Sequence, residues 1–248
     1  MVRKRLITTL TINNGVLFRT RNFLPDYRYT ANFADAWSVD EVVLLDITRE
    51  GTGDRENFYQ MVSTFARSCF VPLAAGGGVR TADEVGRFLS LGADKVVINT
   101  EAARRPEFIR EASRRFGAQC VVVSIDARRE GNDDYRGFTH MGTQPLDVPL
   151  AEWARRAEEL GAGEILIQSI DRDGTLEGYD NRLNRLVSSA VDIPVLVCGG
   201  AGRWAHFVDG FREGGASAVC TTNIYHFTES SIRSAKQYLK KAGIDVRI

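Results

Sequence analysis

Residues 73–100 have the sequence LAAGGGVRTADEVGRFLSLGADKVVINT and align without a gap on residues 196–223, LVCGGAGRWAHFVDGFREGGASAVCTTN. The second copy follows the first by 123 residues, about half of the 248-residue chain, which indicates that one half-structure was used twice. Each copy is typical of an apolar strand, a glycine turn, a helix and a second apolar strand. Because such a unit in a parallel sheet gathers backbone amides around a phosphate, the repeat predicts a duplicated α/β protein with two related anion sites.

The composition favours a globular protein with a large core and no net charge. Apolar residues make up 44% of the chain, and 32 basic residues balance 32 acidic ones, so we expect neither a nucleic-acid partner nor an anionic membrane. The cysteines lack CxxC spacing and lie in or beside apolar runs, which predicts reduced thiols, no metal, no cofactor and a cytoplasmic protein. They are Cys69, Cys120, Cys198 and Cys220. The segment MVRKRLITTL has no long apolar region, so we expect neither export nor a membrane span.

Short β-rich runs alternate with longer helical patterns along the chain. We expect strands at residues 5–12, 41–46, 71–75, 95–98, 120–126, 164–170, 195–198 and 218–222. We expect helices at residues 30–37, 57–68, 82–91, 106–116, 150–160, 182–189, 204–212 and 230–241. The absence of a linker between the halves favours a closed (β/α)8 TIM barrel, a single domain over residues 1–248 with half-barrels at about 1–118 and 119–248. Residues 129–144 break the alternation with three glycines and predict a small hairpin above the catalytic face.

The ends of the expected strands sort the polar residues by role. In a barrel of this kind the carboxyl ends of the strands face the reaction, and the amino ends face the opposite mouth. The expected upper residues are Thr11, Asp46, Asn99, Asp126, Ser169, Asp171, Asp173 and Thr222. The expected lower residues are Arg5, Glu41, Lys95 and Glu164, two of each sign.

Seven motifs in this order carry a resemblance to a known family. They are LLDIT (44–48), AAGGGVRT (74–81), GADKVVINT (92–100), VVVSIDAR (121–128), GAGEILIQSIDRDGT (161–175), GGAG (199–202) and YHF (225–227). From residue 5 to its last residues the chain resembles the cyclase subunit of imidazole glycerol phosphate synthase. The resemblance implies a half-barrel-duplicated enzyme of a glutamine amidotransferase complex, which takes ammonia from a glutaminase at the N-terminal face of the barrel. It also implies a small-molecule substrate with a phosphate at each end.

The resemblance assigns two phosphate sites and an ammonia gate, each with a plainer alternative. The implied phosphate ligands are Gly77, Gly78, Asn99, Thr100, Asp173 and Gly174 in the first site, and Gly200, Ala201, Gly202, Thr222 and Asn223 in the second, with Arg19 in place of a family lysine. The glycines could instead serve only as tight strand–helix turns. The implied gate is Arg5, Glu41, Lys95 and Glu164, which could instead be ordinary ion pairs that close a barrel mouth.

One catalytic position departs from the family. The family chemistry is assigned to two aspartates, at the ends of strands one and five; Asp126 keeps the second place, but Thr11 occupies the first. A threonine hydroxyl cannot exchange protons as a carboxylate does near pH 7, so this change argues against the family reaction. Asp171 is a further catalytic candidate, although helix capping or loop fixing is the commoner role for such an aspartate.

Three functions are compatible with these features. The hypothesis favoured by the kept phosphate loops and gate is a divergent paralogue, of the kind linked to amidation of sugars for surface polysaccharides. It would use ammonia on a phosphate-bearing sugar or sugar nucleotide. The alternatives are the authentic cyclase of histidine biosynthesis, which Thr11 argues against, and a non-catalytic barrel that activates a glutaminase, which Asp126 argues against.

Overall fold

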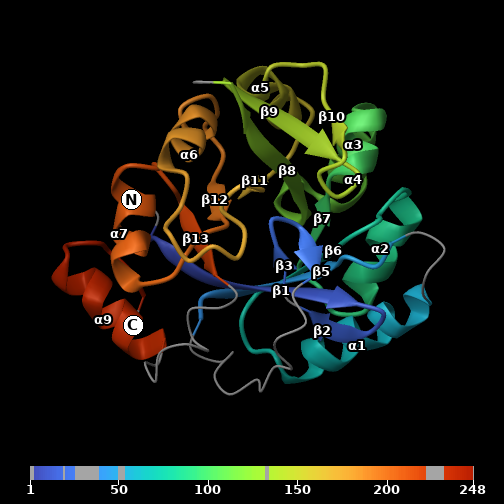
Figure 1. Ribbon diagram of the computed structural model, residues 1–248. Helices are drawn as coiled ribbons and strands as arrows, with labels where there is room; N and C mark the ends of the chain where they lie inside the picture. The colour runs from blue at the N-terminus through green and yellow to red at the C-terminus, as the bar shows by residue number, and fades with distance from the viewer. Residues whose placement is uncertain are drawn as a thin grey trace.

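A closed barrel of parallel strands forms the centre of the computed structural model, which describes residues 3–18, 20–25, 39–49, 54–131, 134–221 and 232–247. Around the barrel the strands run in the order β1 (Arg5–Asn13), β5 (Glu41–Asp46), β6 (Leu73–Gly76), β7 (Lys95–Ile98), β8 (Val121–Glu130), β11 (Glu164–Ser169), β12 (Val195–Cys198) and β13 (Ala218–Thr221). The β13–β1 and β7–β8 pairings close the circle. The predicted (β/α)8 TIM barrel is therefore confirmed (Figure 1).

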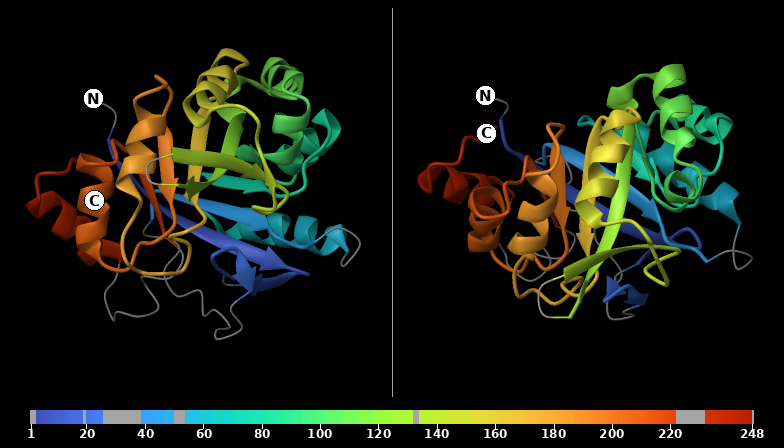
Figure 2. Two further views of the ribbon diagram at one scale, coloured as in Figure 1. Left: turned by 45° about the horizontal axis from the view of Figure 1, so that its top comes forward. Right: turned by 90° about the horizontal axis from the view of Figure 1, so that it is seen from above.

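Helices cover the outside of the barrel, as the two views of Figure 2 show. They are α1 (Arg55–Ser68), α2 (Ala82–Ser90), α3 (Thr100–Arg104), α4 (Glu107–Phe116), α5 (Leu150–Glu159), α6 (Asn181–Ser188), α7 (Trp204–Arg212) and α9 (Ile232–Lys241), with a short 3-10 turn at Ala118–Cys120. The sequence did not predict α3, which begins directly after β7. The expected helix at residues 30–37 lies outside the described residues. Every described helix is too short or too polar to cross a bilayer.

The sequence repeat corresponds to a structural repeat. In the first copy β6, α2 and β7 follow one another, and in the second copy β12, α7 and β13 do so. The strand after α2 begins at Lys95 and the strand after α7 begins at Ala218, which is the 123-residue offset of the aligned sequences. Half-barrel duplication therefore explains why two glycine turns lie at equivalent places on the same rim.

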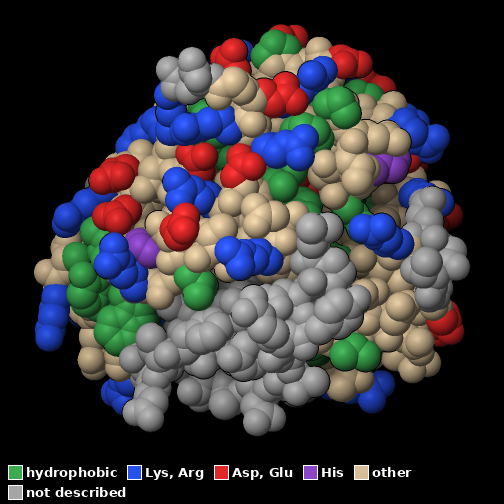
Figure 3. All heavy atoms as spheres, in the orientation of Figure 1, with side chains coloured by type: hydrophobic (Ala, Val, Ile, Leu, Met, Phe, Trp, Pro, Cys, Tyr) green, Lys and Arg blue, Asp and Glu red, His purple; other side chains and the backbone are tan. Residues whose placement is uncertain are grey.

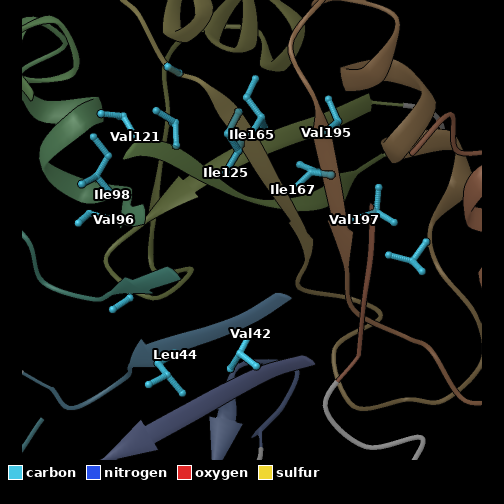
Figure 4. Packing of buried hydrophobic residues seen from close by; sticks show 14 of the residues in the cluster. Val42, Leu44, Val96, Ile98, Val121, Ile125, Ile165, Ile167, Val195 and Val197 are labelled. Atoms are coloured by element: carbon cyan, nitrogen blue, oxygen red, sulfur yellow. The ribbon is translucent and has the colours of Figure 1, made fainter. Parts of the chain in front are cut away.

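Successive side chains along each strand point alternately out of the barrel and into its lumen, and this alternation produces two separate apolar layers. Side chains of one parity, including Val42, Leu44, Val96 and Ile98, point out of the barrel and pack under the helices (Figure 4). Side chains of the other parity fill the lumen. The lumen cluster contains Ile7, Val43, Leu45, Ala74, Val97, Val122, Leu166, Leu196, Ala218 and Cys220, with Cys198 against it. Because both layers are nearly inaccessible to water, the strands form a rigid frame for side chains at either mouth.

Three hairpins extend from the upper rim. Strand β2 (Val16–Phe18) pairs with β1 across Asn14 and Gly15, whose φ values of 52° and 74° are those of a type I′ turn. A second small hairpin joins β3 (Thr20–Arg21) to β4 (Leu24–Pro25). The predicted hairpin over residues 129–144 is confirmed, but it is larger than expected. Strand β8 itself continues into it and pairs with β9 (Asp134–Thr139), which pairs in turn with β10 (Gln144–Pro145).

Candidate active site

Four charged side chains meet at the amino ends of the barrel strands. Arg5 lies 2.7 Å from a Glu41 carboxylate oxygen and 2.8 Å from a Glu164 oxygen. Lys95 contacts the same two carboxylates at 2.9 and 2.8 Å. Each cation therefore bridges both acids, and the four form a closed ring of alternating charge, which we call the lower ring. The structure thus brings together all four residues that the strand starts predicted.

The lower ring stands between solvent and the apolar lumen. Glu41 is its most buried member, with 1% of its side chain exposed, while the Arg5 side chain is 21% exposed. Burial raises the pKa of Glu41; Lys95 and Arg5 oppose that rise and Glu164 adds to it. Ile7, Val43 and Val97 come next along their strands on the lumen side. A charged group that moved from the lower ring into the apolar lumen would lose both its ion-pair partners and its hydration.

At the opposite mouth, Asp126 is held by two side-chain amides. Asn99 donates from Nδ2 to one Asp126 oxygen at 2.9 Å, and Gln168 donates from Nε2 to the other at 3.1 Å. Asn99 directly follows β7, and Gln168 lies opposite Asp126 in the β8–β11 register. Since β7 and β11 flank β8, the carboxylate is contacted from both neighbouring strands. Ser124, two residues earlier on β8, lies 3.5 Å from the second oxygen.

The surroundings of Asp126 set its protonation near neutral pH. Burial raises the pKa of this carboxyl to about 7, while hydrogen bonds from Gln168, Ser124 and Asn99 lower it and the charge of Asp173 raises it. The side chain belongs to a residue that is only 5% exposed, so the burial effect is expected. A carboxyl that titrates near the working pH can both accept and release a proton, which is the requirement for general acid–base chemistry.

Thr11 lies across the barrel from Asp126. It is on β1, which is separated from β8 by the same number of strands in both directions around the barrel. Thr11 has the same parity as Arg5 and Ile7, so its side chain belongs to the lumen-facing set at the carboxyl end of β1. The upper mouth therefore has a carboxyl on one wall and a hydroxyl on the opposite wall.

The other upper carboxylates hold loops. Asp171 accepts a hydrogen bond from the Arg129 backbone at 2.9 Å, and Asp173 accepts one from the Phe23 backbone at 3.1 Å. Asp46 accepts one from the Thr48 backbone at 2.9 Å. Asp126 differs because side-chain amides hold it. Among the described residues, no three His, Cys, Asp or Glu side chains gather as they would around a metal ion.

The first glycine loop is braced from behind. Arg55 of α1 donates to the carbonyls of Gly77 and Gly78 at 2.9 and 2.6 Å. Gly77 has a φ of 110°, and a Cβ there would lie 2.2 Å from the Asp46 carbonyl oxygen, so only glycine fits. Thr100, at the start of α3, accepts from the His140 backbone at 3.1 Å and so joins this loop region to the hairpin.

The second glycine loop is held by the loop after β11. The Gly178 amide donates to the Gly200 carbonyl at 2.7 Å, and a Cβ on Gly202 would lie 2.1 Å from the Leu176 carbonyl oxygen. The Gly202 amide donates to Nδ1 of His206 at 3.1 Å, so a phosphate at this amide would replace the imidazole. Ala201 is buried between these contacts. In the same upper loop, a Cβ on Gly174 would lie 2.5 Å from the Thr20 carbonyl oxygen.

Sequence reasoning reached part of this site. Arg19, Thr222 and Asn223, which were expected to bind phosphate, lie outside the described residues. The sequence did not predict that Ser124 and Gln168 are partners of Asp126. A signal existed for Ser124, because residues two apart on a strand share a face. For Gln168 no local signal existed, because its contact with Asp126 depends on the β8–β11 register.

The chain was compared with models of known protein families, and one family model matches it. The model of the histidine biosynthesis protein family matches residues 9–231, which is most of the chain. The match begins within β1, ends just before α9, and includes Asp126, both glycine loops and the barrel strands from β5 to β13. In the view of Figure 3, acidic and basic side chains are interspersed over the part of the surface that the described residues form.

Proposed function

Because the chain belongs to the histidine biosynthesis protein family, we propose that it is a divergent barrel synthase of that family that adds ammonia to a phosphate-bearing acceptor. The ammonia would come from a glutaminase, and the acceptor would be a sugar or sugar nucleotide of surface polysaccharide synthesis. One combination carries the proposal: a closed lower ring at one mouth, and Thr11 facing Asp126 at the other. The entry for ammonia is kept, while the pair of catalytic carboxylates is not.

The lower ring suits the admission of a small neutral molecule. Each acid has two cationic partners, so one side chain can swing out while the remaining contacts keep the charges paired. Neutral ammonia can then cross the apolar layer, whereas ammonium would leave its hydration behind. Phe70, between α1 and β6 at the same mouth, is 88% exposed. An aromatic side chain of this kind is a suitable anchor for a glutaminase seated over the ring.

The upper mouth suits a reaction with one proton-transferring group. The ammonia nitrogen would attack an electrophilic carbon of the activated acceptor, forming a C–N bond as a C–O bond breaks. Asp126 would take the proton that the nitrogen loses and give it to the departing oxygen, since its pKa of about 7 permits both steps. Thr11 can hydrogen-bond the acceptor but cannot replace a second carboxylate.

The two glycine loops suit the phosphates of the acceptor. Arg55 occupies the carbonyls of Gly77 and Gly78, so the peptide planes of that loop are fixed with their amides on the other side. The Gly202 amide already has a partner, His206, which a phosphate oxygen could displace. Two such loops across one mouth suit a ligand that has a phosphate at each end. They also suit a sugar nucleotide that carries a further anionic group besides its pyrophosphate.

The test uses ammonium in place of the glutaminase. The purified chain is incubated with ammonium chloride and a panel of sugar phosphates and sugar nucleotides, and products are identified by mass spectrometry. We expect an amidated sugar that forms only with ammonium and falls by about 10²–10⁴-fold in Asp126→Asn, the usual contribution of a general base. Turnover of the histidine-pathway intermediate at a rate comparable with that of the family's cyclases would contradict the proposal.

A second candidate is the cyclase reaction of histidine biosynthesis, because the matched family is one of histidine biosynthesis proteins. Thr11 separates the two functions, because that reaction is assigned to paired aspartates. Thr11→Asp restores the missing carboxylate on the wall opposite Asp126. A large gain of cyclase activity in this variant would mean that the pocket still accepts the histidine-pathway substrate; no gain is expected if the acceptor has changed.

A further inference from the structure

We propose that Gln168 is a positioning residue that holds the Asp126 carboxylate in the orientation in which it exchanges a proton with the acceptor. This inference rests on the proposed function, in which Asp126 carries the proton. It goes beyond that function because it assigns a role to a residue on a different strand, which contacts Asp126 and not the reacting atoms. Its basis is the pair of amides at 2.9 and 3.1 Å from the two carboxylate oxygens.

The two contacts fix the plane of the carboxylate. Rotation about the terminal torsion of an aspartate is broad and weakly restricted, so a carboxylate with a donor on one oxygen only can still turn. Here Asn99 holds one oxygen from the β7 side and Gln168 holds the other from the β11 side. The remaining lone pairs are then left in a defined direction, as a general base requires.

Gln168 is itself held in place. Its Nε2 lies 3.3 Å from the Ser124 hydroxyl oxygen as well as 3.1 Å from Asp126. Ser124 and Asp126 are on the same strand and the same face of it. Gln168 lies on β11 opposite Asp126, so its amide group can contact both of these β8 residues. A side chain with two contacts of this kind loses little freedom when the acceptor binds, and it transmits the rigidity of the sheet to the carboxylate.

An amide has the right chemistry for this position. A lysine or arginine would stabilise the ionised carboxylate and remove its basicity, and an apolar side chain would remove one of the hydrogen bonds that oppose the effect of burial. The charged group that acts on Asp126 from the loop after β11 is Asp173, which disfavours ionisation as burial does. Two neutral donors offset part of that effect and leave the proton exchangeable.

The experiment measures the titration of Asp126 directly. Protein labelled with ¹³C at aspartate carboxyls is titrated by NMR, and the Asp126 signal is assigned by its loss in Asp126→Asn. In Gln168→Leu we expect the midpoint to move upward by about one pH unit, the size expected when a hydrogen bond to a charged group is lost. Gln119→Leu, which changes an exposed glutamine in the 3-10 turn just before β8, is the matched control and should leave the midpoint unchanged.

A second variant keeps the test decisive if Gln168→Leu does not fold. Gln168→Glu keeps the shape of the side chain but puts a second carboxylate beside Asp126. The titration midpoint of Asp126 should therefore also rise, and the two coupled carboxyls should titrate in two steps. In ammonium-dependent turnover both variants should lower kcat by about tenfold or more with little change in KM, because a residue that only positions Asp126 makes no contact with the acceptor. A folded Gln168 variant whose Asp126 titrates as in the wild type would overturn the proposal. Since titration needs no acceptor, this result is independent of whether amidation is found.

Discussion

Replacing Lys95 with methionine tests the lower ring most sharply. The substitution keeps the length of the side chain but leaves Glu41 and Glu164 to share one cation, Arg5. Breaking a buried ion pair by removing one partner costs about 3–5 kcal/mol, and the partial exposure of Lys95 and Glu164 places this case at the lower end, about 3 kcal/mol. For a chain of this size that corresponds to a thermal midpoint about 6–12 °C lower than that of the wild type.

The loss in Lys95→Met depends on pH with a definite sign. Removing the cation raises the pKa of Glu41 further, because Lys95 is the main charge that opposes the effect of burial, so the folded variant binds a proton more tightly than the unfolded chain does. Its deficit relative to the wild type is therefore full at pH 8 and shrinks as the pH falls toward 5. Thermal denaturation followed by circular dichroism at both pH values measures the deficit. The double variant Lys95→Met/Glu164→Gln keeps a balanced Arg5–Glu41 pair and should recover part of it.

Arg115→Met is the matched control for Lys95→Met. Arg115 makes an equally short ion pair with Asp83, at 2.6 Å, but the two side chains are 54% and 86% exposed. An exposed pair contributes less than about 1 kcal/mol, so this variant should be close to the wild type at both pH values. If Lys95→Met were as stable as Arg115→Met, or if its deficit did not change between pH 8 and pH 5, the ring would not be the coupled, buried network described above.

Three further predictions concern the upper mouth. The pKa of Asp126 is about 7 in the folded chain and about 4 in the unfolded chain, so its ionisation lowers stability progressively between about pH 4 and pH 7. Asp126→Asn should therefore be more stable than the wild type by up to about 4 kcal/mol at pH 8 and nearly equal at pH 4, by thermal denaturation. At a fixed concentration of free ammonia, wild-type turnover should rise with pH through about 7, as Asp126 ionises; a flat profile would argue against its role as a base. Gly77→Ala, whose Cβ would meet Asp46 O at 2.2 Å, should lose more than about 2 kcal/mol, whereas Gly131→Ala, with open space around it, should lose about 1 kcal/mol.

The barrel could be predicted because its signals are local and repeated. The apolar runs fix the strands to within a few residues, and the repeat at residues 73–100 and 196–223 fixes equivalent units. Short elements were missed for physical reasons. The five-residue α3 begins where a strand pattern has only just ended, and so it has no room for a helical period. The β1–β2 hairpin carried a clear signal, Asn14-Gly15, that went unused.

The site residues likewise fall into two groups, those that could be predicted from the sequence and those that depend on tertiary contacts. The lower ring could be predicted because strand starts share one end of a barrel, which is a consequence of topology alone. The contact of Gln168 with Asp126 could not, since it depends on the β8–β11 register and on side-chain rotamers that no local pattern encodes. The loop-fixing bonds of Asp171 and Asp173 likewise depend on where Arg129 and Phe23 come to lie.

Isotope transfer tests the central claim most directly. The chain is purified with the proposed glutaminase and supplied with glutamine labelled with ¹⁵N in the side-chain amide, excess unlabelled ammonium, the histidine-pathway intermediate and the sugar that proves active with ammonium. We predict that an amidated sugar carries the label almost undiluted, that Lys95→Met dilutes it, and that no labelled imidazole glycerol phosphate forms. Labelled imidazole glycerol phosphate, or a sugar product whose label matches that of the bulk ammonium, would contradict the account.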